Sequence, residues 1–420
     1  MTQSDAEAAA AQECARLTFE ARTFLRNGNK SATLENCMAA LRCGEVPMEQ
    51  GAIIDSLLRE CDRSDIADQI RAQLYKGLAE VEAHYADQAV ALVHMANVLI
   101  LLGEHAKATP HLDKALVLAP DSDEALFLHT LCHLENGTFR PGQIDIAPVL
   151  KASRTPGRAL SGLVSLLGHH GEKQEALRVL DTGLPLLGDK DVLDKRVETL
   201  RAALSGGIEQ INQRETANRI FDSFAETYDT SLAALGNNGP NMIGTVLDDI
   251  GLARDNSLKV FDAGCGTGLC EPHLRPRASL LHGADLSVAM LEKCLAKGTY
   301  DLLCRSDLAA AETLPDDTFD LAVCADVLVY FGRLQEVFTN LAGRLAPGGW
   351  LIFTVEEAPA DIPPPGYGLN PSGRNCHSEA YLRAALAEAG FSIEHLHRDT
   401  LRLEFRKPVP GLAVAAKKNG

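Results

Sequence analysis

Three glycines and one aspartate stand close together where an apolar segment ends. Residues 258–268 read LKVFDAGCGTG, with Asp262 two residues before Gly264, and with Gly266 and Gly268 following at alternate positions. The apolar segment predicts a β-strand, and the residues after the glycines predict the start of a helix. Glycine lets the backbone bend tightly and approach a ligand, and N–H groups at a helix N-terminus bind anions. These residues therefore indicate a site for the anionic part of a cofactor.

Three details distinguish between the cofactors that such a turn can hold. Leu269 stands where the dinucleotide motif GxGxxG requires its last glycine. Asp262 stands where dinucleotide-binding folds usually carry an apolar residue, and a carboxylate there can bind an ammonium group, directly or through water. The string DAGCGTG resembles the first motif of class I methyltransferases. This resemblance implies S-adenosyl-L-methionine as the cofactor, and an NAD- or FAD-dependent enzyme is the alternative.

Further residues follow in the order that the resemblance requires. Asp285 ends the segment LLHGAD, where its carboxylate is expected to bind both ribose hydroxyls; capping of the next helix is the alternative. Asp307 is expected near the adenine amino group, with Leu308 against the ring. Tyr228 is expected to cover the cofactor. The predicted cofactor-binding residues are Tyr228, Asp262, Gly264, Cys265, Gly266, Thr267, Gly268, Asp285, Leu286, Met290, Asp307, Leu308, Cys324 and Ala325.

The residues predicted to act on the methyl acceptor follow the fourth expected strand. Asp326 and Tyr330 come just after that strand, and the Pro- and Gly-rich loop APADIPPPGYGLNPSGRNCHS is long enough to serve as a lid. Arg374, in this loop, is expected to bind an acceptor carboxylate. His377 is predicted to remove a proton, because an ordinary histidine pKa lies near neutrality. The alternative for His377 is a structural role before the predicted helix SEAYLRAALAEAG. The predicted catalytic residues are thus Asp326, Tyr330 and His377.

The acceptor class is narrowed by motifs that the sequence lacks. The fourth expected strand has no Asn/Asp-Pro-Pro-aromatic motif, which amino-methylating enzymes of nucleic acids carry. Cys324 is not preceded by Pro or Thr, which disfavours the enzymes that methylate RNA cytosine through a cysteine. The double-glutamate loop of protein arginine methyltransferases is also absent. A small-molecule or carrier-bound acceptor is therefore expected. Methyl transfer is an in-line displacement that depends mainly on orientation, so it needs a general base only when the nucleophile must lose a proton.

A different pattern occupies the first half of the chain. Gly103, Gly137 and Gly171 are spaced by 34 residues twice (137 − 103 and 171 − 137), and each stands where an apolar helical pattern ends. This pattern resembles the tetratricopeptide repeat, a pair of helices that stacks into arrays which bind peptides or partner proteins. The unit around Gly137 is interrupted at Pro141-Gly142, so its second helix is expected to be irregular. Self-association through the array is the alternative to a docked partner.

The order of the motifs predicts two domains. Gly206-Gly207 marks the boundary, which gives an all-α helical-repeat domain over residues 1–205 and a methyltransferase domain over residues 206–420. The resemblance implies that the second is an α/β Rossmann-like domain with a seven-stranded mixed sheet and helices on both faces. The alternation of Leu401, Leu403 and Phe405 predicts a strand hairpin near the C-terminus.

Composition limits the remaining functional classes. The 420 residues are 46% hydrophobic and 23% charged with a net charge of −17, so no overall basic field favours nucleic acid. The 11 cysteines form no CxxC pair, which argues against a structural zinc site and for a reducing cytoplasm. No metal and no nucleic acid are therefore expected. No membrane is expected either, because no segment has the length of a bilayer span.

Together these observations predict a cytoplasmic S-adenosylmethionine-dependent methyltransferase. Its acceptor would be a small molecule, or a group presented by a carrier or protein, and the helical repeats would dock the partner or substrate. The alternative is a repeat scaffold whose methyltransferase fold binds cofactor without catalysis.

Overall fold

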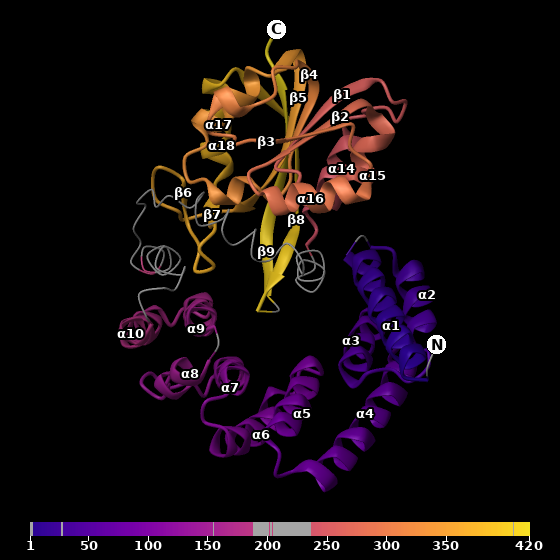
Figure 1. Cartoon of the computed structure of the whole chain (residues 1–420), viewed down its shortest axis with the longest axis vertical. Helices are drawn as coiled ribbons and strands as arrows, with labels where there is room; N and C mark the ends of the chain where they lie inside the picture. The colour runs from indigo at the N-terminus through magenta and orange to yellow at the C-terminus, as the bar shows by residue number, and fades with distance from the viewer. Residues whose placement is uncertain are drawn as a thin grey trace. The chain divides into compact units, whose positions relative to one another are not determined.

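The computed structural model describes residues 3–26, 28–153, 155–187, 201, 204, 237–405 and 407–420. The chain divides into two compact units, Met1–Leu193 and Asp194–Gly420. Figure 1 shows the first in indigo to magenta and most of the second in orange to yellow. The boundary expected between residues 205 and 206 lies outside the described residues and stays a prediction. Within the described ranges, no helix has the length and apolar character needed to cross a bilayer.

Helices make up the described secondary structure of the first unit, which confirms its expected all-α character. Successive helices pack against one another, as α5 does on α6 and α9 on α10. The bounds are α1 (Gln3–Arg26), α2 (Lys30–Ala40), α3 (Met48–Glu60), α4 (Ser64–Tyr85), α5 (Ala89–Leu101), α6 (His105–Leu118), α7 (Asp123–Glu135), α8 (Ala147–Ala152), α9 (Pro156–His169), α10 (Lys173–Gly183) and the short η1 (Leu184–Leu186).

The three regularly spaced glycines each follow a helix of this unit. Gly103, Gly137 and Gly171 come after α5, α7 and α9 with φ of 79°, 66° and 84°. Glycine adopts this left-handed conformation without a Cβ clash and so ends a helix readily. After the interruption at Pro141-Gly142, α8 has only 6 residues, which confirms the expected irregularity. The assignment to the tetratricopeptide family stays a prediction.

A single mixed sheet organises the second unit. Its strands run in the order β3-β2-β1-β4-β5-β7-β6, with β9 paired to β5 and β8 paired to β9. Strands β1 to β5 pair in parallel, whereas β8 and β9 form the expected antiparallel hairpin. The bounds are β1 (Leu258–Ala263), β2 (Ala278–Asp285), β3 (Leu302–Arg305), β4 (Phe319–Cys324), β5 (Leu345–Glu357), β6 (Tyr367–Leu369), β7 (Asn375–His377), β8 (Phe391–Glu404) and β9 (Lys407–Lys418).

The expected number of seven strands is wrong, because the described part of the sheet has nine. The two additional strands, β6 and β7, lie in the Pro- and Gly-rich loop that is long enough to serve as a lid. Cys376 and His377 of β7 pair in parallel with Glu356 and Glu357 at the end of β5. The exposed backbone groups at the end of β5 therefore gain partners from this loop.

Helices cover both faces of the sheet, as expected. Val260 of β1 packs in a core cluster with Ile243 of α14, whereas the next residue, Phe261, packs in another with Phe338 and Leu382 of α17 and α18. Successive strand residues point to opposite faces, which explains the division. The described helices and turns of this unit are α14 (Gly239–Asp249), α15 (Glu271–Leu274), η2 (Arg275–Arg277), α16 (Val288–Lys297), η3 (Ala311–Thr313), η4 (Leu328–Tyr330), α17 (Gln335–Ala342) and α18 (Glu379–Glu388).

Asn238 fixes the start of α14 to strand β8. Its backbone N–H donates to the carbonyl of Leu401 at 2.8 Å, and its side-chain amide donates to the Asp399 carboxylate at 3.0 Å and the Thr400 carbonyl at 3.1 Å. The side chain is buried. Three hydrogen bonds from one residue thus join two segments that lie far apart in the sequence.

Candidate functional site

The reversal of strand order at β1 and β4 gives the position of the candidate site. In open α/β sheets, ligands bind outside the carboxyl ends of the strands where the order reverses. The predicted residues Asp262, Asp285 and Cys324 lie at or next to the carboxyl ends of β1, β2 and β4. Asp307 follows β3 by two residues. Because these four strands are parallel, the topology brings the predicted cofactor-binding residues to one edge of the sheet.

The glycine-rich turn after β1 requires its glycines. Gly264 and Gly268 have φ of 88° and 86°. A Cβ on Gly264 would lie 2.3 Å from Cγ2 of Val327, far inside van der Waals contact. The backbone N–H groups of Gly264 and Cys265 both donate to the carbonyl of Ala284, at 2.7 and 2.9 Å. The turn is therefore held against the end of β2 by backbone contacts that a larger residue at position 264 would disrupt.

Asp285 bridges the glycine-rich turn and the helix that follows β2. One carboxylate oxygen accepts from the N–H of Gly266 at 2.9 Å, and the other accepts from the N–H of Ser287 at 2.9 Å. The N-cap of α16 is Ser287, whose hydroxyl accepts from the N–H of Met290 at 3.2 Å. Ser287, and not Asp285, is therefore the N-cap of α16. Asp285 instead orders the loop at the end of β2.

Asp262 is a carboxylate almost fully removed from water. Its side chain is buried, and the hydroxyl of Tyr300 donates to it at 2.6 Å. Burial raises the pKa of Asp262 to about 7, and the nearby Asp285 acts in the same direction, whereas the Tyr300 hydrogen bond opposes it. A buried carboxyl with this pKa gains from a cationic partner. Tyr300 was missed by the sequence reasoning, although its place just before β3 was a usable signal.

The other predicted cofactor-binding residues lie at the same strand ends with differing burial. Asp307 accepts a hydrogen bond from the N–H of Ala309 at 3.0 Å, which shapes the turn after β3. Tyr228 lies outside the described residues. Cys265, Thr267, Met290, Leu308 and Cys324 are buried, and Leu286, Asp307 and Ala325 are half-buried.

Asp326 combines an unusual backbone with a carboxylate oxygen that accepts no hydrogen bond. Its φ is 58°, a left-handed conformation that costs a non-glycine residue about 1 kcal/mol or more. Its backbone N–H donates to the Thr354 hydroxyl at 2.8 Å. One buried carboxylate oxygen has no hydrogen-bond partner among the described residues, and it lies 3.6 Å from the Arg402 guanidinium. Burial raises the pKa of the predicted residue Tyr330, in the turn η4 that follows Asp326.

A buried cluster of charges lies beside Asp326 and was missed by the sequence reasoning. Arg402 is fully buried and contacts the carboxylates of Glu356 and Glu404, the latter at 2.7 Å. Asn370 also donates to Glu356. Burial raises the pKa of Glu356, against the attraction of Arg402. The alternation along β8 that predicted the strand also places Arg402 and Glu404 on one face, and this was the available signal.

Arg374 belongs to the same cluster. Its guanidinium binds the Glu404 carboxylate at 2.8 Å, and its side chain is 21% exposed. Counting Asp326, Glu356 and Glu404 against Arg374 and Arg402, the cluster has three carboxylates and two guanidinium groups. It can therefore orient a polar molecule through both donors and acceptors. Arg374, which was predicted to bind an acceptor carboxylate, already has a carboxylate partner within the chain.

His377 lies in β7 with little access to water. Its Nε2 donates to the carbonyl of Gly332 at 2.9 Å, and burial lowers its pKa to about 4. Its ring stacks on Tyr381 with 5.6 Å between centroids. An imidazole with this pKa is a weak base at neutral pH. The geometry therefore favours the structural alternative, just before α18, and does not support the proton-removing role.

Comparison with known proteins agrees with this arrangement. Residues 261–353 match the model of a methyltransferase domain. The chain is 28% identical over 153 residues to a malonyl-[acyl-carrier protein] O-methyltransferase of Erwinia billingiae, covering 33% of this chain and 60% of that protein. It is 31% identical over 110 residues to a ubiquinone biosynthesis O-methyltransferase of Paracidovorax citrulli, covering 25% and 46%.

One solved structure is also similar in part. An S-adenosylmethionine-dependent methyltransferase from Mesorhizobium loti is 26% identical and covers 41% of this chain and 96% of that chain, with a TM-score of 0.33. The chain spans between 45% and 60% of the length of the first three curated relatives. Residues 261–353 thus carry the sequence pattern of a methyltransferase domain, as expected, and the curated relatives named above are methyltransferases.

Proposed function

We propose that this chain transfers a methyl group from S-adenosylmethionine to a small molecule, or to a group presented by a carrier or protein. The observation that carries the proposal is the pair of carboxylates, Asp262 and Asp285, at the ends of adjacent parallel strands beside a turn that tolerates only glycine at position 264. Asp262 would bind the donor's ammonium group, and Asp285 its ribose hydroxyls. Asp307 and Leu308 would contact the adenine.

The remaining predicted cofactor-binding residues would contact other parts of the donor. The glycine-rich turn, residues 264–268, would let the donor's amino-acid end approach the backbone closely. Leu286 and Met290 would flank the adenosine, and the small residues Cys324 and Ala325 would allow the backbone to approach the sulfonium. Tyr228 would cover the bound cofactor.

On the acceptor side, we infer that Asp326 receives a hydrogen bond from the nucleophile. Its carboxylate oxygen that accepts no hydrogen bond is suited to accept a proton from a hydroxyl or an amine, and its left-handed backbone is a conformation often held at functional sites. Tyr330 and the Arg374–Arg402 cluster would orient the rest of the acceptor. The curated relatives named above carry the names of enzymes for a carrier-bound group and for a small molecule.

Donor binding is tested by calorimetry on the full chain with S-adenosylmethionine and its demethylated product. One molecule per chain is expected to bind, and Asp285→Ala should weaken binding by at least about tenfold, because each lost charge-assisted hydrogen bond contributes about 1.5–3 kcal/mol. Asp316→Ala is the matched control. The Asp316 side chain is fully exposed, and it precedes β4, whereas the candidate site lies after the carboxyl ends of the strands. Absence of binding by either ligand would contradict the proposal.

Transfer is tested with methyl-labelled S-adenosylmethionine, purified chain and cell extract, followed by separation of the label by size. Label in small molecules identifies a metabolite acceptor, and label on protein supports docking by the helical unit. Asp326→Asn should lower kcat by about 10²–10⁴-fold while leaving donor affinity unchanged. Donor binding without label in any fraction would favour the alternative, a scaffold that binds cofactor without catalysis.

A further inference from the structure

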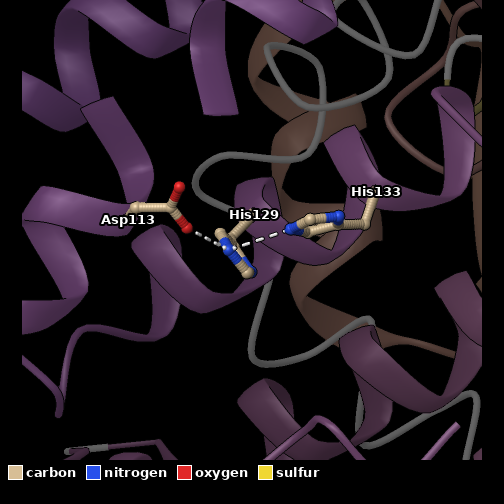
Figure 2. A group of neighbouring side chains, drawn as sticks. All are labelled: Asp113, His129 and His133. Atoms are coloured by element: carbon tan, nitrogen blue, oxygen red, sulfur yellow. Dashed lines mark hydrogen bonds and ion pairs between the residues drawn. The ribbon is translucent and has the colours of Figure 1, made fainter. Parts of the chain in front are cut away.

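Two histidines and one aspartate converge between helices α6 and α7 of the first unit. His129 and His133 are spaced by four residues on α7, which places them on one helix face, and Asp113 comes from α6. Figure 2 shows the three side chains turned toward one another. One ligand atom from each residue lies within 4.8 Å of the other two. This group lies in the helical unit and has no part in the proposed methyl transfer.

The distances between these atoms match those between ligands of a small cation. Nε2 of His129 lies 2.9 Å from Oδ1 of Asp113 and 3.2 Å from Nε2 of His133. Zinc binds imidazole nitrogen and carboxylate oxygen at 2.0–2.2 Å, so two ligands of a tetrahedral ion stand about 3.3 Å apart. These two distances are close to that spacing, and the third, between Asp113 and His133, is within 4.8 Å, so a bound ion would draw these two side chains closer together.

The three side chains cannot all be joined by hydrogen bonds, because too few of the facing atoms carry a proton. Nδ1 of His133 lies 2.8 Å from the Thr138 hydroxyl, and a proton on Nδ1 that is donated there leaves Nε2 with a lone pair. A single N–H on Nε2 of His129 then faces two acceptors, Asp113 and His133, and can serve only one of them.

We propose that Asp113, His129 and His133 bind a divalent ion of the zinc class, with water completing the coordination. Two imidazoles and one carboxylate suit Zn²⁺ and similar transition ions rather than Ca²⁺ or Mg²⁺, which prefer oxygen ligands. The ion replaces the proton on Nε2 of His129 and joins α6 to α7. Thr138 acts as a positioning residue that orients the His133 ring. The expectation of no metal rested on cysteine spacing and did not consider the His-x3-His pattern.

The site is tested on the full chain after removal of metal by a chelator, with Zn²⁺ in competition with a chromophoric chelator. One strongly bound ion per chain is expected, and Asp113→Asn, His129→Gln and His133→Gln should each weaken it by at least about tenfold. Asp113→Asn is the most informative variant, because this side chain is 60% exposed and its replacement leaves the core unchanged. His111→Ala is the matched control on the same helix.

A second measurement examines geometry and the role of Thr138. With Co²⁺ in place of Zn²⁺, the intense visible bands of a tetrahedral ion are expected, and they should disappear in His129→Gln. Thr138→Val, which keeps the side-chain shape, should weaken Zn²⁺ binding by about tenfold. Equal Zn²⁺ affinity in the wild-type chain and in Asp113→Asn would overturn the proposal. Affinity for S-adenosylmethionine should be unchanged in all these variants, so failure here is distinct from failure of the proposed function.

Discussion

At the scale of single residues, Asp262 shows how a binding group can weaken the fold that carries it. The carboxyl is buried, and its pKa of about 7 stands above the ordinary 3.8 because burial penalises the charged form. A group whose pKa is raised by folding opposes folding at any pH where it is ionised in the unfolded chain. The loss of folding stability caused by Asp262 is therefore complete above pH 7 and disappears near pH 4.

Asp262→Asn is therefore expected to stabilise the ligand-free protein while it weakens donor binding. The free energy of unfolding near pH 8 should rise by up to about 4 kcal/mol, because each pKa unit corresponds to about 1.36 kcal/mol. Urea unfolding at pH 8 and pH 4 measures the difference, which should vanish at pH 4. A variant that is less stable than the wild type at pH 8 would contradict this account of Asp262.

The same carboxyl predicts a pH dependence for donor affinity. Only the ionised form attracts the ammonium group of S-adenosylmethionine, so affinity should be full above pH 7 and fall as pH decreases below 7, by up to about tenfold per unit. Calorimetry between pH 5.5 and about 8.5 follows the change. The slope should be lost in Asp262→Asn, and an unchanged slope in that variant would assign the titration to another group.

At the scale of the elements, strand β8 carries two arginines in opposite environments. Arg402 is fully buried among Glu356, Glu404 and Asp326, whereas the Arg398 side chain is 51% exposed and pairs with Glu357 and Glu379. Removing one partner from a buried ion cluster leaves charges unpaired in a medium of low dielectric constant. Exposed pairs are screened by water and contribute little.

Replacement of the two arginines should thus have unequal effects. Arg402→Ala is expected to lower the free energy of unfolding by about 3–5 kcal/mol. Arg398→Ala, the matched control on the same strand, should lower it by about 1 kcal/mol or less. Denaturant unfolding of both variants under the same conditions measures the two values. Similar losses of unfolding free energy in the two variants would show that the buried Arg402 cluster stabilises the fold no more than the exposed Arg398 pairs.

A strand could be predicted from the sequence where an apolar run is followed directly by residues of the cofactor motif. The run from Leu258 to Ala263 is apolar and ends in glycines, so both its extent and its place at the site follow from the sequence. The short strands β6 and β7 could not be predicted, because they exist only through pairing with the end of β5. Burial of His377 depends on that same pairing, and sequence alone assigned it the pKa of an exposed histidine. Arg402 was missed for a related reason, since two of its partners, Asp326 and Glu356, are distant in sequence.

At the scale of the whole molecule, the second unit has hydrophobic clusters of its own. Of the described residues, these two clusters contain only residues between Met242 and Ala416. Such a unit can fold by itself. The fragment Asp194–Gly420 should therefore bind S-adenosylmethionine with an affinity within about threefold of the full chain, a difference below 1 kcal/mol.

Transfer by this fragment should differ according to the acceptor. A small-molecule acceptor needs only the second unit, whereas an acceptor presented by a protein should lose at least about tenfold in kcat/KM without the helical unit, because its docking energy is lost. Comparing label transfer by the fragment and by the full chain measures this ratio. Equal transfer to a protein acceptor would exclude docking by the helices.

The attachment of Asn238 to β8 has a mechanical meaning. Residues 237 and 238 are the first described residues after position 204, and three hydrogen bonds hold Asn238 to residues 399–401. A pull applied to the backbone at residue 237 would therefore be borne first by β8, one residue from Arg402. Force applied there would reach the charged acceptor cluster before it reaches the glycine-rich turn. Such a pull should thus disturb acceptor orientation at a lower load than donor binding.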